Sequence, residues 1–402
     1  MIDITSTLGL LLAIAAAVLL VPTTLLLLQM LAAWPRGAAE PTAPSTSPRP
    51  KLAVLMPAHN EAAGIVAAIE AVLRQLVAGD RLLVVADNCS DTTAQVAAAA
   101  GAEVVERRDT QHRGKGYALD HGVRFLQADP PALVIVVDAD CEVQAGSLDR
   151  LVHACALAAR PVQALYLMKS PPGAGLKTRV AEFAWAVKNH ARPLGGLRLY
   201  MPCQLMGTGM AFPWSIIATA PLASGHIVED MQLGLDLASA GTPPKFCPQA
   251  MVTSIFPFSE EGTTAQRTRW EHGHLGVIVS QGLPMLCKAV IRGRPALVAM
   301  VLDLCVPPLA SLVLLLVAVL GGAALLSAAG GAGLPLVLVL VAAAQLSLSI
   351  GLAWWRFGRG IVSLKELLTA PAYVLAKIPI YAKLLKGRQV EWVRTKRDDN
   401  SK

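Results

Sequence analysis

Two long stretches without a charged residue constrain the fold of this 402-residue chain more than any other feature. The first runs from Ile4 to Pro35, and the second from Leu304 to Trp355. A bilayer core needs about 20 apolar residues as a helix. The first stretch therefore predicts one transmembrane helix, and the second predicts two. With 54% hydrophobic and 16% charged residues, the chain is too apolar for an ordinary soluble protein, in which about a quarter of residues are charged.

The first stretch is expected to be a retained anchor rather than a cleaved signal peptide. Its flank, MIDITST, carries an acid and no Lys or Arg, and its apolar core is longer than that of a signal peptide. Basic residues lie at the ends of the stretches and in the tail: Arg36, Arg49, Lys51, Arg292, Arg294, Arg356, Arg359, Arg388, Arg394, Lys396 and Arg397. Because positive charge favours the cytoplasmic side, we expect the N-terminus outside and these residues in the cytoplasm.

The pattern divides the chain into six segments. These are an N-terminal transmembrane helix (1–35), a Pro/Ser/Thr linker (36–50), an α/β domain (51–275), an interfacial helix (276–295), two transmembrane helices (296–356), and an interfacial or re-entrant segment with a basic cytosolic tail (357–402). Within the last, residues 361–386 are apolar but carry Lys365, Glu366, Lys377 and Lys383. An interfacial helix and a fourth span with snorkelling lysines both remain open.

Cysteine spacing and net charge exclude some classes of protein. The seven cysteines show no C-x-x-C spacing, so neither a disulfide framework nor a zinc site is indicated. The formal net charge of +7 would suit nucleic acid, but much of the excess lies beside the apolar stretches. Attraction to anionic lipid headgroups is the simpler explanation, and no nucleic-acid partner is expected.

Strand and helix patterns alternate after the linker. Strands are predicted at 52–57, 81–87, 102–107 and 132–138, and helices at 61–77, 90–100 and 115–126. This alternation is typical of a doubly wound, Rossmann-like parallel sheet, which binds ligands beyond the carboxyl ends of its strands. The polar clusters AHNE (58–61), DNCSD (87–91) and DADCE (138–142) fall at those ends.

The DADCE cluster indicates a metal site. Asp138 and Asp140 follow a very apolar strand, and a bend would let both reach one ion. Oxygen ligands suit Mg²⁺ or Mn²⁺, which proteins bind through one or two carboxylates plus substrate phosphates. The alternative is a pair of acids in a polar loop that caps a helix near Ser147.

Two further clusters are suited to a nucleotide. Asp87 and Asn88 can hydrogen-bond a base edge or ribose, whereas Ser90 or Asp91 would cap the next helix in any case. The basic, Gly-rich HRGKG (112–116) precedes a helix and could hold phosphate, although it lacks the spacing of a Walker A motif. A solvated loop is the alternative.

Two clusters near the end of the α/β domain could act on an acceptor. Glu229 and Asp230 offer a general base, although acids here would also suit the start of a helix. Gln266, Arg269 and Trp270 lie on adjacent turns of one predicted helix, where Arg269 can pair with phosphate and Trp270 offers an apolar platform. An amphipathic helix on the membrane is the alternative. His272 and His274 are expected to make polar contacts only.

Taken in order, these motifs resemble the membrane-integrated family 2 glycosyltransferases, which have a GT-A fold and include polysaccharide synthases and ceramide glucosyltransferases. The matching motifs are PAHNE (57–61), DNCSD (87–91), GKG (114–116), DAD (138–140), CQLMGTGMAF (203–212), VED (228–230) and QRTRW (266–270). The order of the set, rather than any single motif, makes the resemblance specific. Val228 stands where the family has Thr.

The resemblance implies a role for each matching residue. Nucleotide-sugar contacts would come from Pro57, His59, Glu61, Asp87, Asn88, Lys115, Asp138, Asp140, Gln266, Arg269 and Trp270. Gly207, Thr208, Gly209 and Trp270 would meet the acceptor, Asp140 and Asp138 would hold Mg²⁺ or Mn²⁺, and Asp230 beside Glu229 would be the catalytic base.

The implied reaction is an inverting transfer of sugar from a nucleotide sugar, expected to be a UDP-sugar, to a lipid-linked or polysaccharide acceptor at the bacterial inner membrane. Processive polymerisation with export is an alternative, but three spans are few for a secretion channel unless the chain forms a homo-oligomer or has partners in a synthesis complex. A non-catalytic membrane subunit is a third possibility. A dinucleotide-dependent enzyme is disfavoured, because AHNEAAG replaces G-x-G-x-x-G after the first strand.

Overall fold

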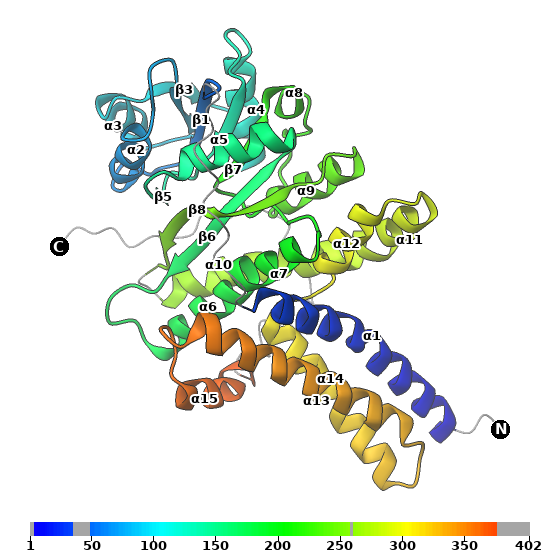
Figure 1. Cartoon of the computed structure of the whole chain (residues 1–402). Helices are drawn as coiled ribbons and strands as arrows, with labels where there is room; N and C mark the ends of the chain where they lie inside the picture. Colours follow the sequence, from blue (N-terminus) through cyan, green and yellow to red (C-terminus); the bar gives the residue numbers. More distant parts are fainter. Residues whose placement is uncertain (1–3, 35–48, 258–259, 376–402) are drawn as a thin grey trace. The chain divides into compact units, whose positions relative to one another are not determined.

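The computed structural model describes residues 4–34, 49–257 and 260–375 (Figure 1). The described residues form two compact units. The sheet unit comprises 49–174, 201–257 and 260–273, and the helical unit comprises 4–34, 175–200 and 274–375. The basic tail, the end of the 361–386 segment and most of the predicted linker lie outside the described residues.

The sheet unit is built on an eight-stranded sheet in the order β3-β2-β1-β4-β7-β6-β8-β5. The strands are β1 (Leu52–Ala58), β2 (Arg81–Asp87), β3 (Glu103–Arg107), β4 (Leu133–Val136), β5 (Glu142–Val143), β6 (Val162–Lys169), β7 (Met210–Pro213) and β8 (Lys245–Ile255). The first four strands in the chain pair in parallel, as predicted. Beyond these four strands the sheet is mixed, because β7 runs antiparallel to both β4 and β6.

Helices cover the sheet, and those at 65–73, 93–99 and 115–126 lie where the alternating pattern predicts helices. These helices are α2 (Ile65–Leu73), α3 (Thr93–Ala99), α4 (Lys115–Leu126), α5 (Ser147–Ala158), α8 (Trp214–Ile217) and α9 (Glu229–Ser239), and α10 (Glu260–Val277) begins in this unit. One core packs Leu119 of α4 and Leu233 of α9 with Leu55 and Val85 of the sheet. Neighbouring strand residues such as Val84, which point to the opposite face, are fully buried too. Burial of both faces explains why these strands are almost continuously apolar.

The helical unit contains the predicted transmembrane segments. Its helices are α1 (Ile4–Ala33), α6 (Leu176–Ala186), η1 (Val187–Ala191), α7 (Arg192–Arg198), η2 (Ile278–Gly282), α11 (Leu283–Ile291), α12 (Pro295–Leu304), α13 (Leu309–Ala328), α14 (Leu334–Ala353), η3 (Trp354–Gly358) and α15 (Leu364–Leu375). Among the described residues, four helical stretches are long and apolar enough to cross a membrane: Thr7–Ala33, Thr268–Ile291, Leu309–Ala328 and Leu334–Gly358. Three of them coincide with the predicted spans. The fourth overlaps the predicted interfacial helix, which stays a prediction.

Residues 175–200 belong with the apolar helices, although the sequence predicts them inside the α/β domain. Polar contacts join this segment to two of those helices. Arg192 donates from Nη2 to Asp303 Oδ1 at 2.8 Å, and Gln29 donates from Nε2 to the same oxygen at 2.7 Å. The Arg192 side chain is 9% exposed, so it needs this partner to offset the loss of hydration.

We predict that Gly195→Ala destabilises the helical unit. A methyl group at position 195 would lie 2.0 Å from the backbone oxygen of Gln29, so α1 and α7 would have to separate. Such overpacking typically costs about 1–3 kcal/mol. Thermal unfolding of the detergent-solubilised protein measures the effect. Gly351→Ala is the control, because a methyl group there meets no atom within 4 Å. Equal melting temperatures for the two variants would contradict the close approach.

Candidate active site

Three predicted side chains converge on the backbone of Gly207. A methyl group at this position would lie 3.4 Å from Asp230 Oδ2, 3.5 Å from Lys115 Nζ and 4.0 Å from Asp138 Oδ2. Lys115 is the first residue of α4, Asp138 follows β4, and Asp230 lies in the first turn of α9. Gly207 has a φ of 89°, which favours glycine. The sheet unit thus brings together groups that are far apart in the sequence.

Lys115 is the positive centre of this cluster. Its ammonium group forms an ion pair with Asp138, donates to the Gly207 carbonyl oxygen at 2.8 Å, and lies 4.0 Å from Glu229 Oε1. Burial opposes the charge of Lys115, but Asp138, Glu229 and Asp230 outweigh burial and raise its pKa. Burial also raises the pKa of Asp138, against the opposing effect of Lys115.

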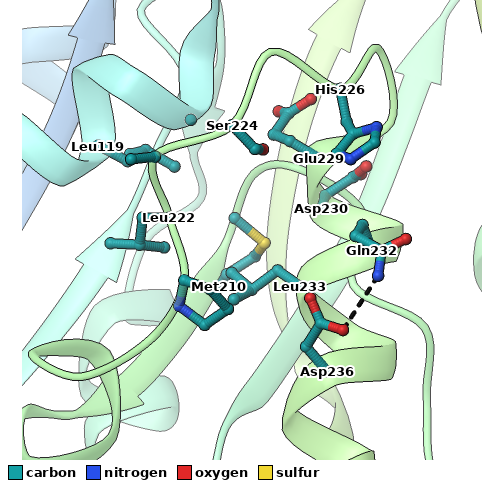
Figure 2. Close-up of a pocket in the computed structure, with 13 residues that line it drawn as sticks. Leu119, Met210, Leu222, Ser224, His226, Glu229, Asp230, Gln232, Leu233 and Asp236 are labelled. Carbon is teal, nitrogen blue, oxygen red and sulfur yellow. Dashed lines mark hydrogen bonds between the residues drawn. The ribbon is translucent and has the colours of Figure 1, made fainter.

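Burial and the neighbouring Asp230 carboxylate raise the pKa of Glu229 to about 7, against the pull of Lys115. Glu229 and Asp230 both lie at the start of α9, as the helix-start alternative required. Asp230 Oδ1 accepts a hydrogen bond from its neighbour's backbone nitrogen at 2.8 Å. Glu229 and Asp230 therefore lie at a helix N-terminus (Figure 2) and also face the charged cluster around Lys115.

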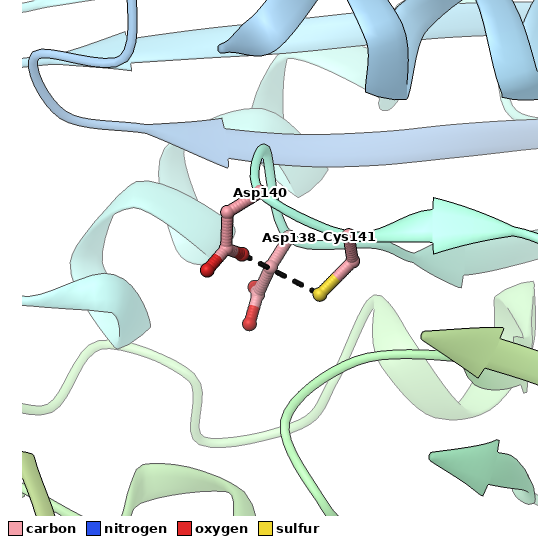
Figure 3. Close-up of side chains that lie close together, drawn as sticks. All are labelled: Asp138, Asp140 and Cys141. Carbon is pink, nitrogen blue, oxygen red and sulfur yellow. Dashed lines mark hydrogen bonds between the residues drawn. The ribbon is translucent and has the colours of Figure 1, made fainter. Parts of the chain in front are cut away.

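Asp138, Asp140 and Cys141 form a group whose donor atoms lie within 4.8 Å of one another (Figure 3). Thr208 Oγ1 accepts from the backbone nitrogen of Asp138 at 3.1 Å, and the Cys141 thiol donates to Asp140 Oδ1 at 3.4 Å. Burial and Asp140 raise the pKa of the Cys141 thiol well above its usual range, so it is an S–H donor at neutral pH. The remaining donors are carboxylate oxygens, which fit Mg²⁺ or Mn²⁺.

Arg107 fixes the neighbouring strand ends and was not foreseen from the sequence. Its Nη1 donates to Asp87 Oδ1 at 2.7 Å, and its Nη2 donates to Asp109 Oδ2 at 3.0 Å and to the His112 carbonyl oxygen at 2.9 Å. The Asp87 and Arg107 side chains are each only 10% exposed. The parallel register is the feature that could have indicated this contact, because Arg107 ends β3 directly opposite Asp87 at the end of β2. One guanidinium thus orients Asp87 and holds the loop that leads to Lys115.

The loops after β1 and β2 are tied together. His59 Nδ1 lies 2.7 Å from the Asp87 carbonyl oxygen, and Asn60 Oδ1 accepts from the Ser90 backbone nitrogen at 2.7 Å. Asp91 Oδ1 accepts from the Thr93 backbone nitrogen at 3.0 Å, which fits its expected place at the start of α3. Sequence reasoning did not single out Asn60. Its φ is 54°, and Asn88, in the loop after β2, has a similar φ of 52°.

The remaining predicted residues vary in their surroundings. Pro57 pairs in register with Val85, and the Glu61 backbone nitrogen donates to Thr93 Oγ1 at 2.8 Å. The Thr208 side chain is fully buried and holds Asp138 rather than facing solvent. Gly209 pairs with neighbouring strands, accepting from the Ala164 backbone nitrogen at 2.8 Å. Of the predicted acceptor loop, Gly207 lies beside the charged side chains, and Thr208 contacts the backbone of Asp138.

The helix α10 carries Gln266, Arg269 and Trp270, all partly exposed. Farther along the same helix, a methyl group at Gly273 would lie 2.6 Å from Val228 Cγ1. The helix therefore passes the start of α9, one residue before Glu229. Val228, which departs from the family's Thr, is part of this helix contact.

The pKa of Glu229 predicts a pH-dependent stability in the absence of divalent ions. Because the pKa rises from 4.5 to about 7 on folding, the folded state keeps a proton that the unfolded state loses. Stability should therefore fall between about pH 4.5 and 7 by on the order of 1–3 kcal/mol. Glu229→Gln should lose this component. Melting temperature against pH measures it, and parallel curves for both proteins would refute the assignment.

Arg107→Ala should weaken nucleotide binding by about tenfold or more, because it leaves Asp87 without its buried partner and releases the following loop. Arg108→Ala is the matched control. The Arg108 side chain is 81% exposed and pairs only with Glu106 at 3.2 Å among its described contacts. Calorimetric titration with UDP and Mn²⁺ measures both. Equal affinities would show that the Arg107 network does not shape the site.

Comparisons with known proteins identify the family of the chain. A family model described as glycosyltransferase like family 2 matches residues 48–273, more than half of the chain. Uncharacterized glycosyltransferases of Mycobacterium bovis and Mycobacterium tuberculosis are each 42% identical over 99 residues, which cover 25% of this chain and 41% of the relative. The chain thus matches less than half the length of these relatives.

Among solved structures, the chain is similar to a mannosyltransferase from Pyrobaculum calidifontis in complex with GDP-Man and Mn²⁺. The identity is 19%, the TM-score is 0.58, and the match covers 93% of this chain and 99% of that one. This likeness supports the fold, whereas the family match covers the site residues from Pro57 to Trp270. The chain therefore belongs to glycosyltransferase family 2, with a GT-A fold.

Proposed function

We propose that this glycosyltransferase transfers a sugar from a nucleotide sugar, a UDP-sugar by family resemblance, to a lipid-linked or membrane-associated acceptor, with inversion at the anomeric carbon. The observation that carries the proposal is the convergence of Lys115, Asp138 and Asp230 around Gly207. The ammonium group of Lys115, beside the candidate metal ligand Asp138, is suited to pair with the diphosphate of the donor. The carboxylate of Asp230 is suited to act as the general base. Polysaccharide or glycolipid synthesis is the corresponding biological role.

Each charged group has a place in a single displacement. The acceptor hydroxyl attacks the anomeric carbon and passes its proton to Asp230, while the bond to the nucleoside diphosphate breaks. Lys115 offsets negative charge that develops on the leaving group, and Arg269 would pair with it as a planar fork. Asp87, oriented by Arg107, would contact the nucleobase of the donor.

The carboxylates of Asp138 and Asp140 would hold a divalent cation, Mg²⁺ or Mn²⁺. When bound, such an ion supplies positive charge to the departing diphosphate. The Cys141 thiol supports this arrangement by donating to one oxygen of Asp140, which orients the carboxylate.

Conservative substitutions test these roles. Asp140→Asn and Asp230→Asn should each lower metal-dependent nucleotide release by about 100-fold or more. Glu142→Gln is the control from the same motif, because Glu142 is exposed on β5, and it should stay within about twofold of wild type. Purified full-length protein is assayed with a panel of nucleotide sugars and Mg²⁺ or Mn²⁺. Full activity in both Asn variants would refute the proposal. A ladder of long products would show that the protein polymerises the sugar.

We also propose that the sheet unit is cytoplasmic, the N-terminus is outside, and 276–295 is an interfacial helix at the bacterial inner membrane. If Thr268–Ile291 spanned the bilayer, Arg292 and Arg294 would lie on the opposite side from the sheet unit, against the charge preference. The stretch exposes Lys288 as well as apolar side chains such as Val279 and Leu283, and this mixture supports a helix lying in the interface.

Alkaline phosphatase fusions distinguish the two topologies. With an interfacial helix, a fusion after Arg294 should be inactive, because it stays in the cytoplasm, and a fusion after Gly330, between α13 and α14, should be active. A fourth span at Thr268–Ile291 would reverse both results, which would contradict the proposed topology.

A further inference from the structure

The helices α1 and α14 lie against each other and run in the same direction. A methyl group at Gly9, near the start of α1, would lie 3.7 Å from the side chain of Ala332, just before α14. Farther along both helices, Thr23 Oγ1 donates to Gln345 Oε1 at 2.9 Å. Both helices are long and apolar enough to cross a membrane, so their C-terminal ends would reach the same side of it.

Exposed tryptophans lie at these two ends. Trp34, the residue after α1, is 37% exposed, and Trp355, in η3 directly after α14, is 52% exposed. Indole rings are enriched where the lipid tails meet the headgroups, because they are largely apolar and carry one N–H donor. The two tryptophans therefore indicate the headgroup level of a bilayer.

Three arginines gather at this end of the helical unit. Arg198 ends α7, and its Nη1 donates to the Ala32 carbonyl oxygen at 2.9 Å, which holds the guanidinium at the end of α1. Arg356 lies in η3, and Arg359 directly follows it. Arg198 is close enough to Arg356 for their charges to act on each other.

Aromatic rings hold two of these guanidinium groups. Arg359 lies over the Trp355 ring at 4.4 Å from its centroid, and Arg356 lies over the Phe357 ring at 5.2 Å. The Phe357 ring packs edge-on against His190 at 4.7 Å between centroids. Burial and the charge of Arg356 lower the pKa of His190 to about 4, so this imidazole is neutral at pH 7. The positive charge here comes from the arginines.

This charge is not balanced by an acid in the part of the chain that the structure describes. Asp303 and Glu366 pair with other arginines of the helical unit. None of Arg198, Arg356 and Arg359 forms an ion pair with a described residue. Like charges held near one another repel, and an anion between them would replace this repulsion with attraction.

We propose that this end of the helical unit binds the headgroup phosphate of an anionic phospholipid. Arg198 and Arg356 would pair with the phosphate oxygens, for which a guanidinium is suited. Leu31 of α1 and Leu348 of α14, each 52% exposed, would contact the acyl chains. A membrane lipid fits these polar and apolar groups together, whereas a soluble phosphate fits the arginines alone. The inference rests on membrane insertion of the apolar helices and does not depend on the transferase reaction.

The test is native mass spectrometry of the detergent-solubilised full chain with dioleoylphosphatidylglycerol or dioleoylphosphatidylcholine. The wild-type protein should bind the anionic lipid about tenfold more tightly or better, and Arg356→Gln should lose about tenfold of that affinity. Arg292→Gln is the matched control, because Arg292 is an exposed arginine that follows the apolar helix α11, and it should stay within about twofold of wild type. Arg359→Gln should weaken binding in the same direction, and it replaces Arg356→Gln if that variant melts at a lower temperature without lipid.

Equal affinity for the two lipids, or unchanged affinity in the arginine variants of η3 and its following turn, would overturn the proposal. An equal loss in Arg356→Gln and Arg292→Gln would overturn it too, because diffuse attraction to basic residues would then explain the binding. Free sn-glycerol 1-phosphate distinguishes the lipid from a soluble phosphate. It should bind at least about tenfold more weakly than the lipid, and equal binding would contradict the assignment to a lipid.

Discussion

The ammonium group of Lys115 is the interaction on which the site depends. It lies among carboxylates that come from the loop after β4 and from the start of α9, and its partner Asp138 is largely removed from water. Without this cation, the carboxylates of Asp138, Glu229 and Asp230 would repel one another in a poorly solvated space. The position of α4, which begins at Lys115, therefore determines how much positive charge offsets these acids.

The backbone around this cation shows how tightly the elements are fitted. Gly207 passes between the charged groups in a conformation with positive φ, and Gly116 allows the 221–226 loop to rest on α4. At the neighbouring strand ends, Arg107 forms an ion pair with Asp87, as Lys115 does with Asp138. Asp87 and Asp138 are thus each held by a basic residue from another element, which fixes the direction of these two carboxylates before a ligand arrives.

Much of this arrangement could be predicted from the sequence, because parallel strands have a simple signature. Buried apolar runs predicted β1, β2 and β4, and polar residues at their ends made Asp87, Asp138 and Asp140 candidates. The pairing of Lys115 with Asp138 could not be predicted, since it depends on where the start of α4 meets the end of β4. Arg107 was missed because it was read as the last residue of a strand, and its importance comes from the register with Asp87.

The antiparallel β7 is only four residues long and has no pattern of its own. Residues 175–200 carry charges such as Arg192, which concealed their packing with the apolar helices.

Lys115 is proposed to be the cation that receives the diphosphate, and one titration tests this role directly. Calorimetry with UDP and Mn²⁺ compares the wild-type protein with Lys115→Met, which keeps the side-chain length but removes the charge. Lys51→Met, at an exposed position just before β1, controls for the loss of a lysine. The account predicts that Lys115→Met weakens nucleotide binding by about tenfold or more, while Lys51→Met binds like the wild type. Equal affinity for all three proteins would contradict it.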